Sequence, residues 1–514
     1  MSVQAFRIWN FMGFQDSDWI ALRPINLLFG RNATGKSVIL RALLLLKQSL
    51  ANPPGGDALT FFSKDGIDAG SFQQILHRNA KPDNNEPEPG EHSTIAFGFA
   101  CRINPGLLES FQTEERREEA KAKGEHAVSE KEAWATLRLD FGPVVTGRRI
   151  SLRAVEIRAP WLDPEGEDDG PLLFGAEWLE SERVAGRWVF PPSLVEQRWV
   201  PSAENPWDSL EDFGQGTGFL PMLPGPEVDD GEDEYKSDSD IAREKSDYEI
   251  VRGLLDEFRQ TISAFLRSLH YLGPVRGKPR RFYYAPGAMS SGTGLKGMNV
   301  LEDWLATWGT DQWQEERERV NAHLTALDLG LQLQVRPLGE ERKPHQSIFE
   351  VLFQEKEGAR TSLCDTGFGW SQMLPIVLEC ALAEEGATII IEEPEAHLHP
   401  GAQAELGDLF IRMTEEGKRF LVETHSEHLL LRIRRRVAET TAKIIPPNDS
   451  MSLDSEDLKV YFVDRAKGQS STTELVIDRL GSIIDSPERF RGFFSDDARE
   501  VFNLTKAALQ AETL

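Results

Sequence analysis

Residues 26–48 read NLLFGRNATGKSVILRALLLLKQ: an apolar run breaks into glycines, passes a lysine and a serine, and becomes apolar again. The first apolar part predicts a short strand, and the part after Ser37 predicts a helix. The segment between them fits the pattern G-x-x-x-x-G-K-[ST] in full. Its positions are Gly30, Arg31, Asn32, Ala33, Thr34, Gly35, Lys36 and Ser37. A strand before this pattern and a helix after it are the context in which such a loop holds a nucleotide triphosphate.

The chemistry of the loop explains its residue types. Glycines allow backbone N–H groups to turn around a phosphate, and the positive end of the following helix points at the same anion. Lys36 supplies a positive charge for the β- and γ-phosphates, and the Ser37 hydroxyl suits a magnesium ion. The sequence therefore predicts ATP and Mg²⁺ as cofactors.

A phosphate loop needs a carboxylate on the metal side, and residues 387–400, ATIIIEEPEAHLHP, supply two. A buried strand that ends in Glu392 and Glu393 places both acids at the ligand-binding edge of an open α/β sheet. We expect Glu392 to face the Mg²⁺ shell through water and Glu393 to act as general base; the alternative is that the acids only end a strand. More than 350 residues separate them from the loop, so we expect neighbouring strands drawn from both ends of the chain.

A second apolar strand, in RFLVETHSEHLL at residues 419–430, ends in Thr424-His425-Ser426. A histidine at this edge can reach the γ-phosphate and sense its presence, and we favour this role for His425 over a structural one. The four histidines of this region do not follow a standard zinc spacing. They are His397, His399, His425 and His428.

Composition limits the class of protein. The 514 residues carry a net charge of −27, which argues against broad coating of nucleic acid but not against a local basic track. The start of the sequence lacks a secretory signal, the longest apolar run is too short for a bilayer, and the three cysteines form no disulfide or metal pattern. We therefore expect a cytoplasmic protein without a membrane partner.

Apolar strands that alternate with helices predict an α/β fold, with an α+β region inserted in the middle of the chain. A charge-dense stretch from about 106 to 135 predicts an exposed helix, and residues 136–200 predict short strands. Apolar residues at helical spacing from Val251 to Leu269 predict a buried helix face. We divide the chain into an N-terminal ATPase lobe (1–105), the insertion (106–245), a C-terminal ATPase lobe (246–440) and a C-terminal extension (441–514).

With these motifs in hand, the chain resembles the ABC-type heads of the structural-maintenance-of-chromosomes (SMC) and RecF class. More narrowly, it is similar to bacterial ATPases related to the overcoming-lysogenization-defect (OLD) family. The resemblance covers about residues 1–80 and 270–435. It rests on five segments in this order: LRPINLLFGRNATGKSVILRALLLLKQSL, YLGPVRGKPRRFY, DTGFGWSQMLPIVLE, IIIEEPEAHLHP and LVETHSEHLLLRIR. It implies a P-loop NTPase head of the ABC type.

The resemblance also implies roles for particular residues. GFGWSQ stands where the ABC signature would be and places Gly367, Gly369, Ser371 and Gln372 at the start of a helix aimed at the γ-phosphate of an opposite subunit. AHLHP stands at the D-loop, and His425 is the switch histidine. Two heads would close around two ATP molecules, as a homodimer or a higher homo-oligomer, and reopen on hydrolysis.

The chain departs from the pattern in three places: the signature is not Leu-Ser-Gly-Gly-Gln, the first acid is Glu392 rather than Asp, and only Gln73 or Gln74 suggests a glutamine loop. Many OLD relatives carry a Toprim nuclease, but no convincing Toprim acid cluster follows the switch region here.

Three functions remain open. The first is the ATPase switch of an anti-phage defence system whose output belongs to an effector protein encoded nearby. The second is a DNA-binding repair or maintenance ATPase, and the third is a nuclease with an unrecognised site. The DNA hypothesis rests on basic residues that we otherwise expect to sense phosphate or to pair with acids at interfaces. They are Arg276, Lys278, Arg280, Arg281, Arg432, Arg434, Arg435 and Arg436.

Overall fold

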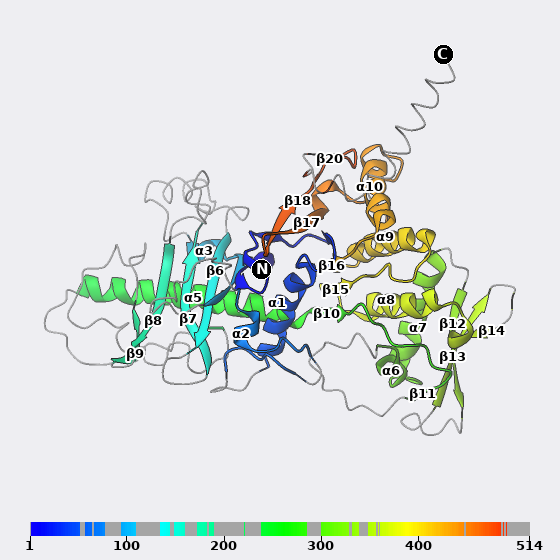
Figure 1. Cartoon of the computed structure of the whole chain (residues 1–514), viewed down its shortest axis with the longest axis horizontal. Coiled ribbons are helices and arrows are strands. Elements are labelled where there is room, and N and C mark those ends of the chain that lie inside the picture. Colours follow the sequence, from blue (N-terminus) through cyan, green and yellow to red (C-terminus); the bar gives the residue numbers. More distant parts are fainter. Residues whose placement is uncertain are drawn as a thin grey trace, which may run out of the picture. The chain divides into compact units, whose positions relative to one another are not determined.

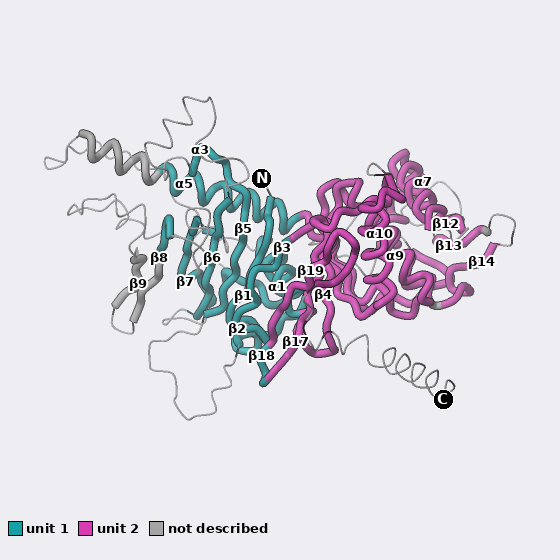
Figure 2. The backbone as a smooth tube through the Cα atoms, turned by 90° about the horizontal axis from the view of Figure 1, so that it is seen from above, with its two compact units in different colours: residues 1–21, 38–267, 467–469 teal, residues 22–37, 268–466, 470–514 magenta. Residues whose placement is uncertain are grey.

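A computed structural model shows the chain as two compact units, which are coloured separately in Figure 2. Unit 1 comprises residues 1–21, 38–267 and 467–469, and unit 2 comprises residues 22–37, 268–466 and 470–514. The structure describes residues 2–51, 57–63, 66–77, 94–108, 134–143, 149–159, 172–181, 184–189, 220–221, 238–284, 300–327, 331–338, 348–355, 358, 360–446, 449–484, 487 and 490.

Unit 2 is built on a six-stranded sheet in the order β10-β15-β16-β4-β17-β18 (Figure 1). Its strands are β4 (Ile25–Phe29), β10 (Leu269–Leu272), β15 (Thr388–Glu392), β16 (Arg419–Glu423), β17 (Leu458–Ala466) and β18 (Gln469–Glu474). The pairs from β10 to β17 are all parallel. Every residue of β4 and β15 is buried, as expected for strands of a parallel sheet that are covered on both faces.

This sheet confirms that the α/β head is assembled from N- and C-terminal segments, because β4 pairs with β16 and β17. One expectation was wrong: the loop strand β4 and the acid strand β15 are not neighbours, since β16 lies between them. Hydrophobic sequence identifies buried parallel strands but not their order, because each offers the same apolar surface to either neighbour. All three strands still end at the same edge of the sheet.

The other elements of unit 2 pack around this sheet. The helices are α6 (Val300–Leu305), α7 (Asp311–Ala326), α8 (Phe368–Leu382), α9 (Pro400–Glu415) and α10 (Glu427–Thr441). A four-stranded sheet joins β11 (Tyr283–Tyr284), β12 (Leu331–Leu338), β13 (Ile348–Glu355) and β14 (Arg360–Ser362), and β19 (Val476–Ile477) pairs with β20 (Ile483–Ile484). Two 3-10 turns are η5 (Leu363–Asp365) and η6 (Ser455–Asp457). One continuous hydrophobic core joins residues of the large sheet, α6 to α10 and the smaller sheet.

Unit 1 contains an antiparallel sheet in the order β2-β1-β5-β6-β7-β8-β9, with β3 paired to β1. The strands are β1 (Val3–Phe11), β2 (Phe14–Asp16), β3 (Ile20–Ala21), β5 (Ile95–Arg102), β6 (Trp134–Pro143), β7 (Ile150–Arg158), β8 (Leu172–Ser181) and β9 (Val184–Val189). The helices are α2 (Phe72–Ile75), α3 (Pro105–Leu108), α5 (Asp238–Arg267) and the greater part of α1 (Lys36–Ser49). The predicted apolar face of α5 is confirmed, because its residues from Val251 to Leu266 are buried. Most of the predicted helix at 106–135 lies outside the described residues.

The two units interleave along the chain instead of following the four predicted segments one after another. Unit 2 takes residues 22–37 from the predicted N-terminal lobe, and α1 begins in unit 2 and continues in unit 1. Residues after 440, which the sequence sets apart as an extension, contribute β17 and β18 to the main sheet. Among the described helices, none is long and apolar enough to cross a membrane.

Candidate nucleotide-binding site

The predicted phosphate loop connects β4 to α1 at the carboxyl edge of the main sheet. Gly30 has no room for a side chain, because a Cβ atom there would lie 2.2 Å from the carbonyl oxygen of Val463 on β17. Lys36 is buried, and its Nζ donates to the carbonyl oxygens of Gly30 at 3.0 Å and Arg31 at 2.9 Å. The Lys36 ammonium group is thus hydrogen-bonded to the backbone of its own loop, where we expect it to bind phosphate.

Glu423, at the end of β16, is the acid that contacts the loop most directly. Its Oε2 accepts a 2.7 Å hydrogen bond from the Ser37 hydroxyl, and its Oε1 lies 3.6 Å from Lys36 Nζ. Glu423 is not among the residues that the sequence motifs indicated, because the motif at the end of this strand centres on His425, two residues later. The available signal was the same as for Glu392 and Glu393: a carboxylate that directly ends a buried apolar strand.

Glu393 lies in the turn that follows β15, with a left-handed backbone at φ 44°. This region is unfavourable for a residue with a Cβ atom and persists only where the surroundings hold it. The Glu393 N–H donates to the carbonyl oxygen of Glu423 at 2.8 Å. The hydrogen bond ties the turn to the end of β16, so the predicted general base lies next to the acid that contacts Ser37.

Glu392 is buried and points toward a different neighbour from the one predicted. Its Oε1 accepts a 2.8 Å hydrogen bond from the Tyr271 hydroxyl, and Tyr271 lies on β10 at the far side of β15 from the phosphate loop. The carboxylate contacts to Lys36 and Ser37 come instead from Glu423. That Glu392 contributes to an Mg²⁺ shell remains a prediction.

His425 and Glu395 form the outer part of the site. The carboxylate of Glu395 accepts a 2.5 Å hydrogen bond from the backbone N–H of His425, which links the segment after β15 to the segment after β16. Burial lowers the pKa of His425, and the positive charge of Lys36 lowers it further. Both effects favour the neutral imidazole, while the charge of Glu393 acts in the opposite direction. Glu395, like Glu423, was not singled out from the sequence.

Burial governs the charges at the centre of the site. Burial raises the pKa of Glu423, while the Ser37 hydroxyl and the Lys36 charge act in the opposite direction. Burial lowers the pKa of Lys36, and Glu423 opposes that shift. Each group therefore stabilises the charged form of the other, as expected for an opposite-charge pair removed from water.

The residues present fit a divalent cation. Ligand atoms of Glu393, Glu423 and His425 all lie within 4.8 Å of one another. Mg²⁺ prefers oxygen ligands and is usually held by one or two carboxylates together with phosphate oxygens. Glu423, Glu393 and the Ser37 hydroxyl supply such oxygens, which leaves the His425 nitrogen for the phosphate side.

The signature-like segment begins α8. Gly367 is the N-cap residue and is exposed, whereas Ser371 and Gln372 are buried in unit 2. A Cβ atom on Gly369 would lie 3.2 Å from the carbonyl oxygen of His397, so the segment in the D-loop position packs against the start of α8. Of these four residues, Gly367 is the exposed one. The glutamine-loop candidates Gln73 and Gln74 lie in unit 1, where Gln74 accepts a hydrogen bond from the Ser71 N–H.

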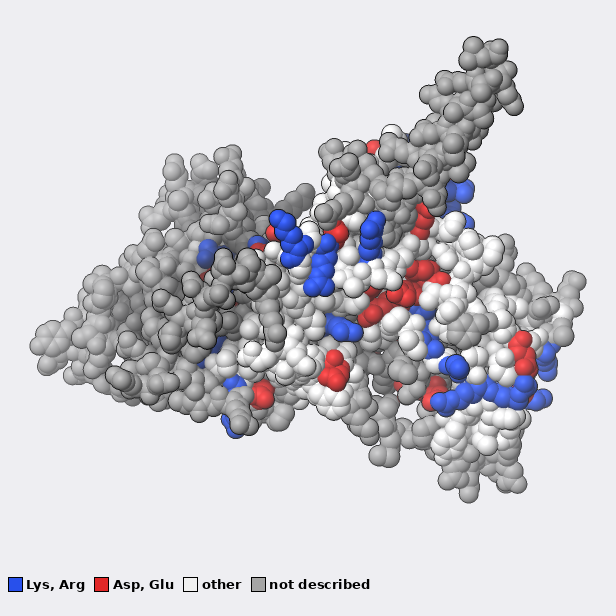
Figure 3. Space-filling view, in the orientation of Figure 1, with Lys and Arg blue, Asp and Glu red and all other residues white. Residues whose placement is uncertain are grey.

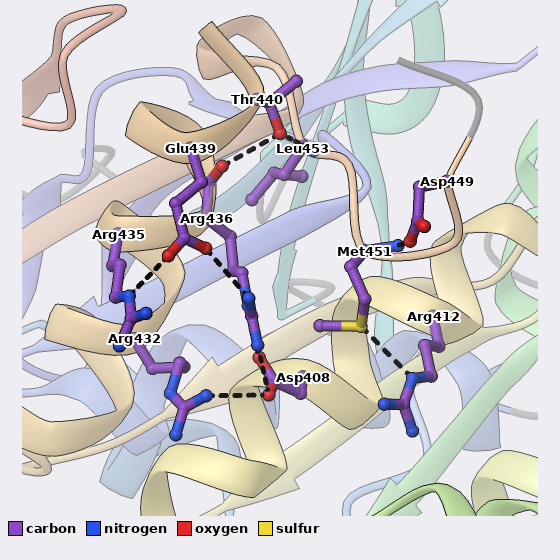
Figure 4. Close-up of polar contacts among 10 residues, drawn as sticks. All are labelled: Asp408, Arg412, Arg432, Arg435, Arg436, Glu439, Thr440, Asp449, Met451 and Leu453. Atoms are coloured by element: carbon purple, nitrogen blue, oxygen red, sulfur yellow. Dashed lines mark hydrogen bonds and ion pairs between the residues drawn. The ribbon is translucent and has the colours of Figure 1, made fainter. Parts of the chain in front are cut away.

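Most of the basic residues proposed for DNA contact have acidic or backbone partners within unit 2. Arg280 pairs with Glu302, and Arg281 pairs with Asp365. On α10, Arg432 and Arg436 both pair with Asp408 of α9, as Figure 4 shows. Arg435 pairs with Glu439, and Arg434 donates to the carbonyl oxygen of Gly481. On the face drawn in Figure 3, Lys and Arg side chains of the described residues lie interspersed with Asp and Glu.

Comparison with known proteins finds a similarity over part of this unit. The family model of the AAA ATPase domain matches residues 298–430, which contain Glu392, Glu393 and His425. No curated protein matches the chain. The chain is similar to a solved SMC head bound to the C-winged helix domain of ScpA, at 11% identity, with coverage of 93% of this chain and 99% of that one and a TM-score of 0.41. It is also similar to the SMC head domain from Thermotoga maritima, at 10% identity, 92% and 98% coverage, and a TM-score of 0.39. The family match supports an ATPase domain in unit 2.

Proposed function

We propose that unit 2 binds ATP with Mg²⁺ and hydrolyses it. The observation that carries this proposal is the contact of Glu423 with both Lys36 and Ser37, beside Glu393 and His425. These residues come from three parallel strands that end at one edge of the sheet. An anion-binding loop and a group of carboxylates at the same edge suit a triphosphate and its metal ion.

The residues divide the chemistry among them. Lys36 and the backbone of residues 30–37 would bind the phosphates, and Glu423 with Ser37 would hold Mg²⁺, which when bound neutralises phosphate charge. Glu393 would take a proton from the water that attacks the γ-phosphorus. The bond from that phosphorus to the bridging oxygen then breaks, and ADP leaves. His425 would contact the γ-phosphate.

Phosphate release and ATP binding by purified variants test this proposal. We expect Lys36→Ala to abolish ATP binding and hydrolysis. We expect Glu393→Gln to retain binding but to lower kcat by about 100-fold or more, because a general base contributes about 10²–10⁴-fold. Arg435→Ala, an exposed residue outside the site, should leave both unchanged. Hydrolysis by Glu393→Gln at the wild-type rate would show that Glu393 is not the general base.

We further propose that ATP joins two heads, with the start of α8 facing the nucleotide of the opposite subunit. Gly367 permits a matched test, because no atom lies within 4 Å of a Cβ atom at this N-cap. Ser and Asp are both good N-cap residues, but only Gly367→Asp adds a charge that repels phosphate. In the Glu393→Gln background with ATP, sedimentation should show a dimer for Gly367→Ser and a monomer for Gly367→Asp. Equal dimerisation would reject this arrangement.

The biological output that we propose is control of an effector protein in bacterial anti-phage defence. The support is the sequence resemblance to OLD-related ATPases. Phage plating on cells that express this chain with its neighbouring genes tests it. Protection that requires both Lys36 and a neighbouring gene supports the proposal, and protection by this chain alone would place the effector activity, including a nuclease, within it.

A DNA-maintenance ATPase is the alternative function. The internal pairing of Arg280 and Arg281 weakens it, and Lys278 is an exposed cation of the same segment. Duplex binding measured at two salt concentrations separates the two functions, since phosphate contacts weaken steeply with salt. Salt-sensitive binding that a Lys278/Arg280/Arg281 triple alanine variant loses would favour the DNA function.

A further inference from the structure

Arg276 follows β10 and belongs to the basic residues on which the DNA hypothesis rests. The structure places it elsewhere. Because β10 runs parallel to β15, with Leu272 opposite Ile391, the segment after β10 emerges beside the turn that follows β15. Arg276 is 3% exposed, and its Nη2 donates to the carbonyl oxygens of Glu392 at 2.8 Å and Glu393 at 3.2 Å.

This guanidinium is held at a cost to stability. Its Nε and Nη1 are buried and have no hydrogen-bond partner among the described residues. Buried unpaired donors and buried charges are unfavourable, and an apolar side chain of similar size often replaces them without loss of stability. The nearby charges of Glu395 and Glu393 favour the buried cation, but a buried charge with unused donors is weak support for a purely stabilising role. Its contacts to the turn point to a second role.

The turn that Arg276 contacts is the strained one. Glu393, at φ 44°, is held through its N–H by the end of β16. Its carbonyl oxygen accepts from Ala396 within the turn at 3.1 Å and from Arg276 at 3.2 Å. Without Arg276, the contacts to Glu423 and Ala396 would remain, but the turn would lose its link to the segment that follows β10.

We propose that Arg276 is a positioning residue for ATP hydrolysis, which holds the Glu392–Glu393 turn so that the Glu393 carboxylate faces the phosphate loop. The inference rests on the proposed ATPase function. In this role Arg276 does not contact the nucleotide. Its loss should therefore affect ATP binding and the chemical step differently. The binding of ATP depends on the loop, whereas the chemical step depends on the orientation of the base.

Steady-state kinetics of Arg276→Met test the inference, since methionine keeps an unbranched apolar stem. We expect kcat to fall by about 10–100-fold, as for a misoriented catalytic group, while KM for ATP and the melting temperature stay near the wild-type values. Arg336→Met, at an exposed arginine of β12 that pairs with Glu350, should change none of the three. A lowered melting temperature together with a raised KM would show a merely structural role and overturn the inference, as would an unchanged kcat.

Rescue of a second variant keeps the inference testable if Arg276→Met folds poorly. Arg276→Ala leaves a space for a free guanidinium ion, and added guanidinium at low millimolar concentration should restore part of its kcat but not that of Lys36→Ala. Restoration of neither would contradict the positioning role. If the wild-type protein itself releases no phosphate from ATP, the proposed function fails; if it does and Arg276→Met matches it, only this inference fails.

Discussion

Glu423 joins the phosphate loop to the acidic turn. Its side chain contacts Lys36 and Ser37, and its backbone carbonyl accepts from Glu393. The sequence identified the loop, Glu393 and His425 because each belongs to a motif with its own spacing. It did not distinguish Glu423 from Glu392, because both end apolar strands, and only the order of strands decides which of them contacts the loop.

The Mg²⁺ dependence of hydrolysis distinguishes these two acids. We expect Glu423→Gln to raise the Mg²⁺ concentration at half-maximal activity by about tenfold or more, because it removes a charged oxygen beside Ser37. Glu392→Gln keeps an acceptor for the Tyr271 hydroxyl and should change this concentration much less. The reverse order of effects would restore Glu392 as the metal-side acid.

Glu395 gives a prediction about pH. Burial raises its pKa above the ordinary value of 4.5, so its favourable contribution is fully present below pH 4.5 and is lost as pH rises through the folded-state pKa. Glu395→Gln keeps an oxygen for the His425 N–H and should raise the free energy of unfolding at pH 8. Urea unfolding should show no gain at pH 4, and the exposed control Glu384→Gln should show none at either pH. A gain in the free energy of unfolding at pH 4 but not at pH 8 would contradict the predicted direction of the pH dependence.

At the scale of elements, α9 and α10 are joined by the aspartate that Figure 4 shows between two arginines. Asp408 accepts from Arg432 at 3.0 Å and from Arg436 at 2.8 Å. Asp408→Ala leaves two partly buried cations without this partner and should lower the free energy of unfolding by about 1–3 kcal/mol. Arg435→Ala breaks an exposed pair and should change it by about 0–0.5 kcal/mol. Equal losses in urea unfolding would show that Asp408 has no special role.

The same elements show what the sequence could predict. The continuous apolar runs of β4, β15 and β16 and the helical spacing of α5 identified these elements. The pairing of α9 with α10 through Asp408 depends on side-chain directions across two helices, which a linear pattern does not contain. The α10 arginines form such internal ion pairs, in agreement with the expected pairing with acids rather than with a basic track.

At the scale of the molecule, residues 22–37 supply β4 and the phosphate loop of unit 2. The other strands of its main sheet come from residues 268–474. The helix after the loop starts in unit 2 and continues in unit 1. The long separation between motifs predicted assembly from both ends, whereas the interleaving of the units needed the structure.

A crystal structure of the Glu393→Gln protein with ATP and Mg²⁺ would test whether this edge of the sheet holds the nucleotide. We expect a triphosphate on the backbone of residues 30–37, with the metal ion bound by Ser37 Oγ and next to the Glu423 carboxylate. A triphosphate bound away from this loop, or a metal ion that contacts neither Ser37 nor Glu423 directly or through water, would contradict it.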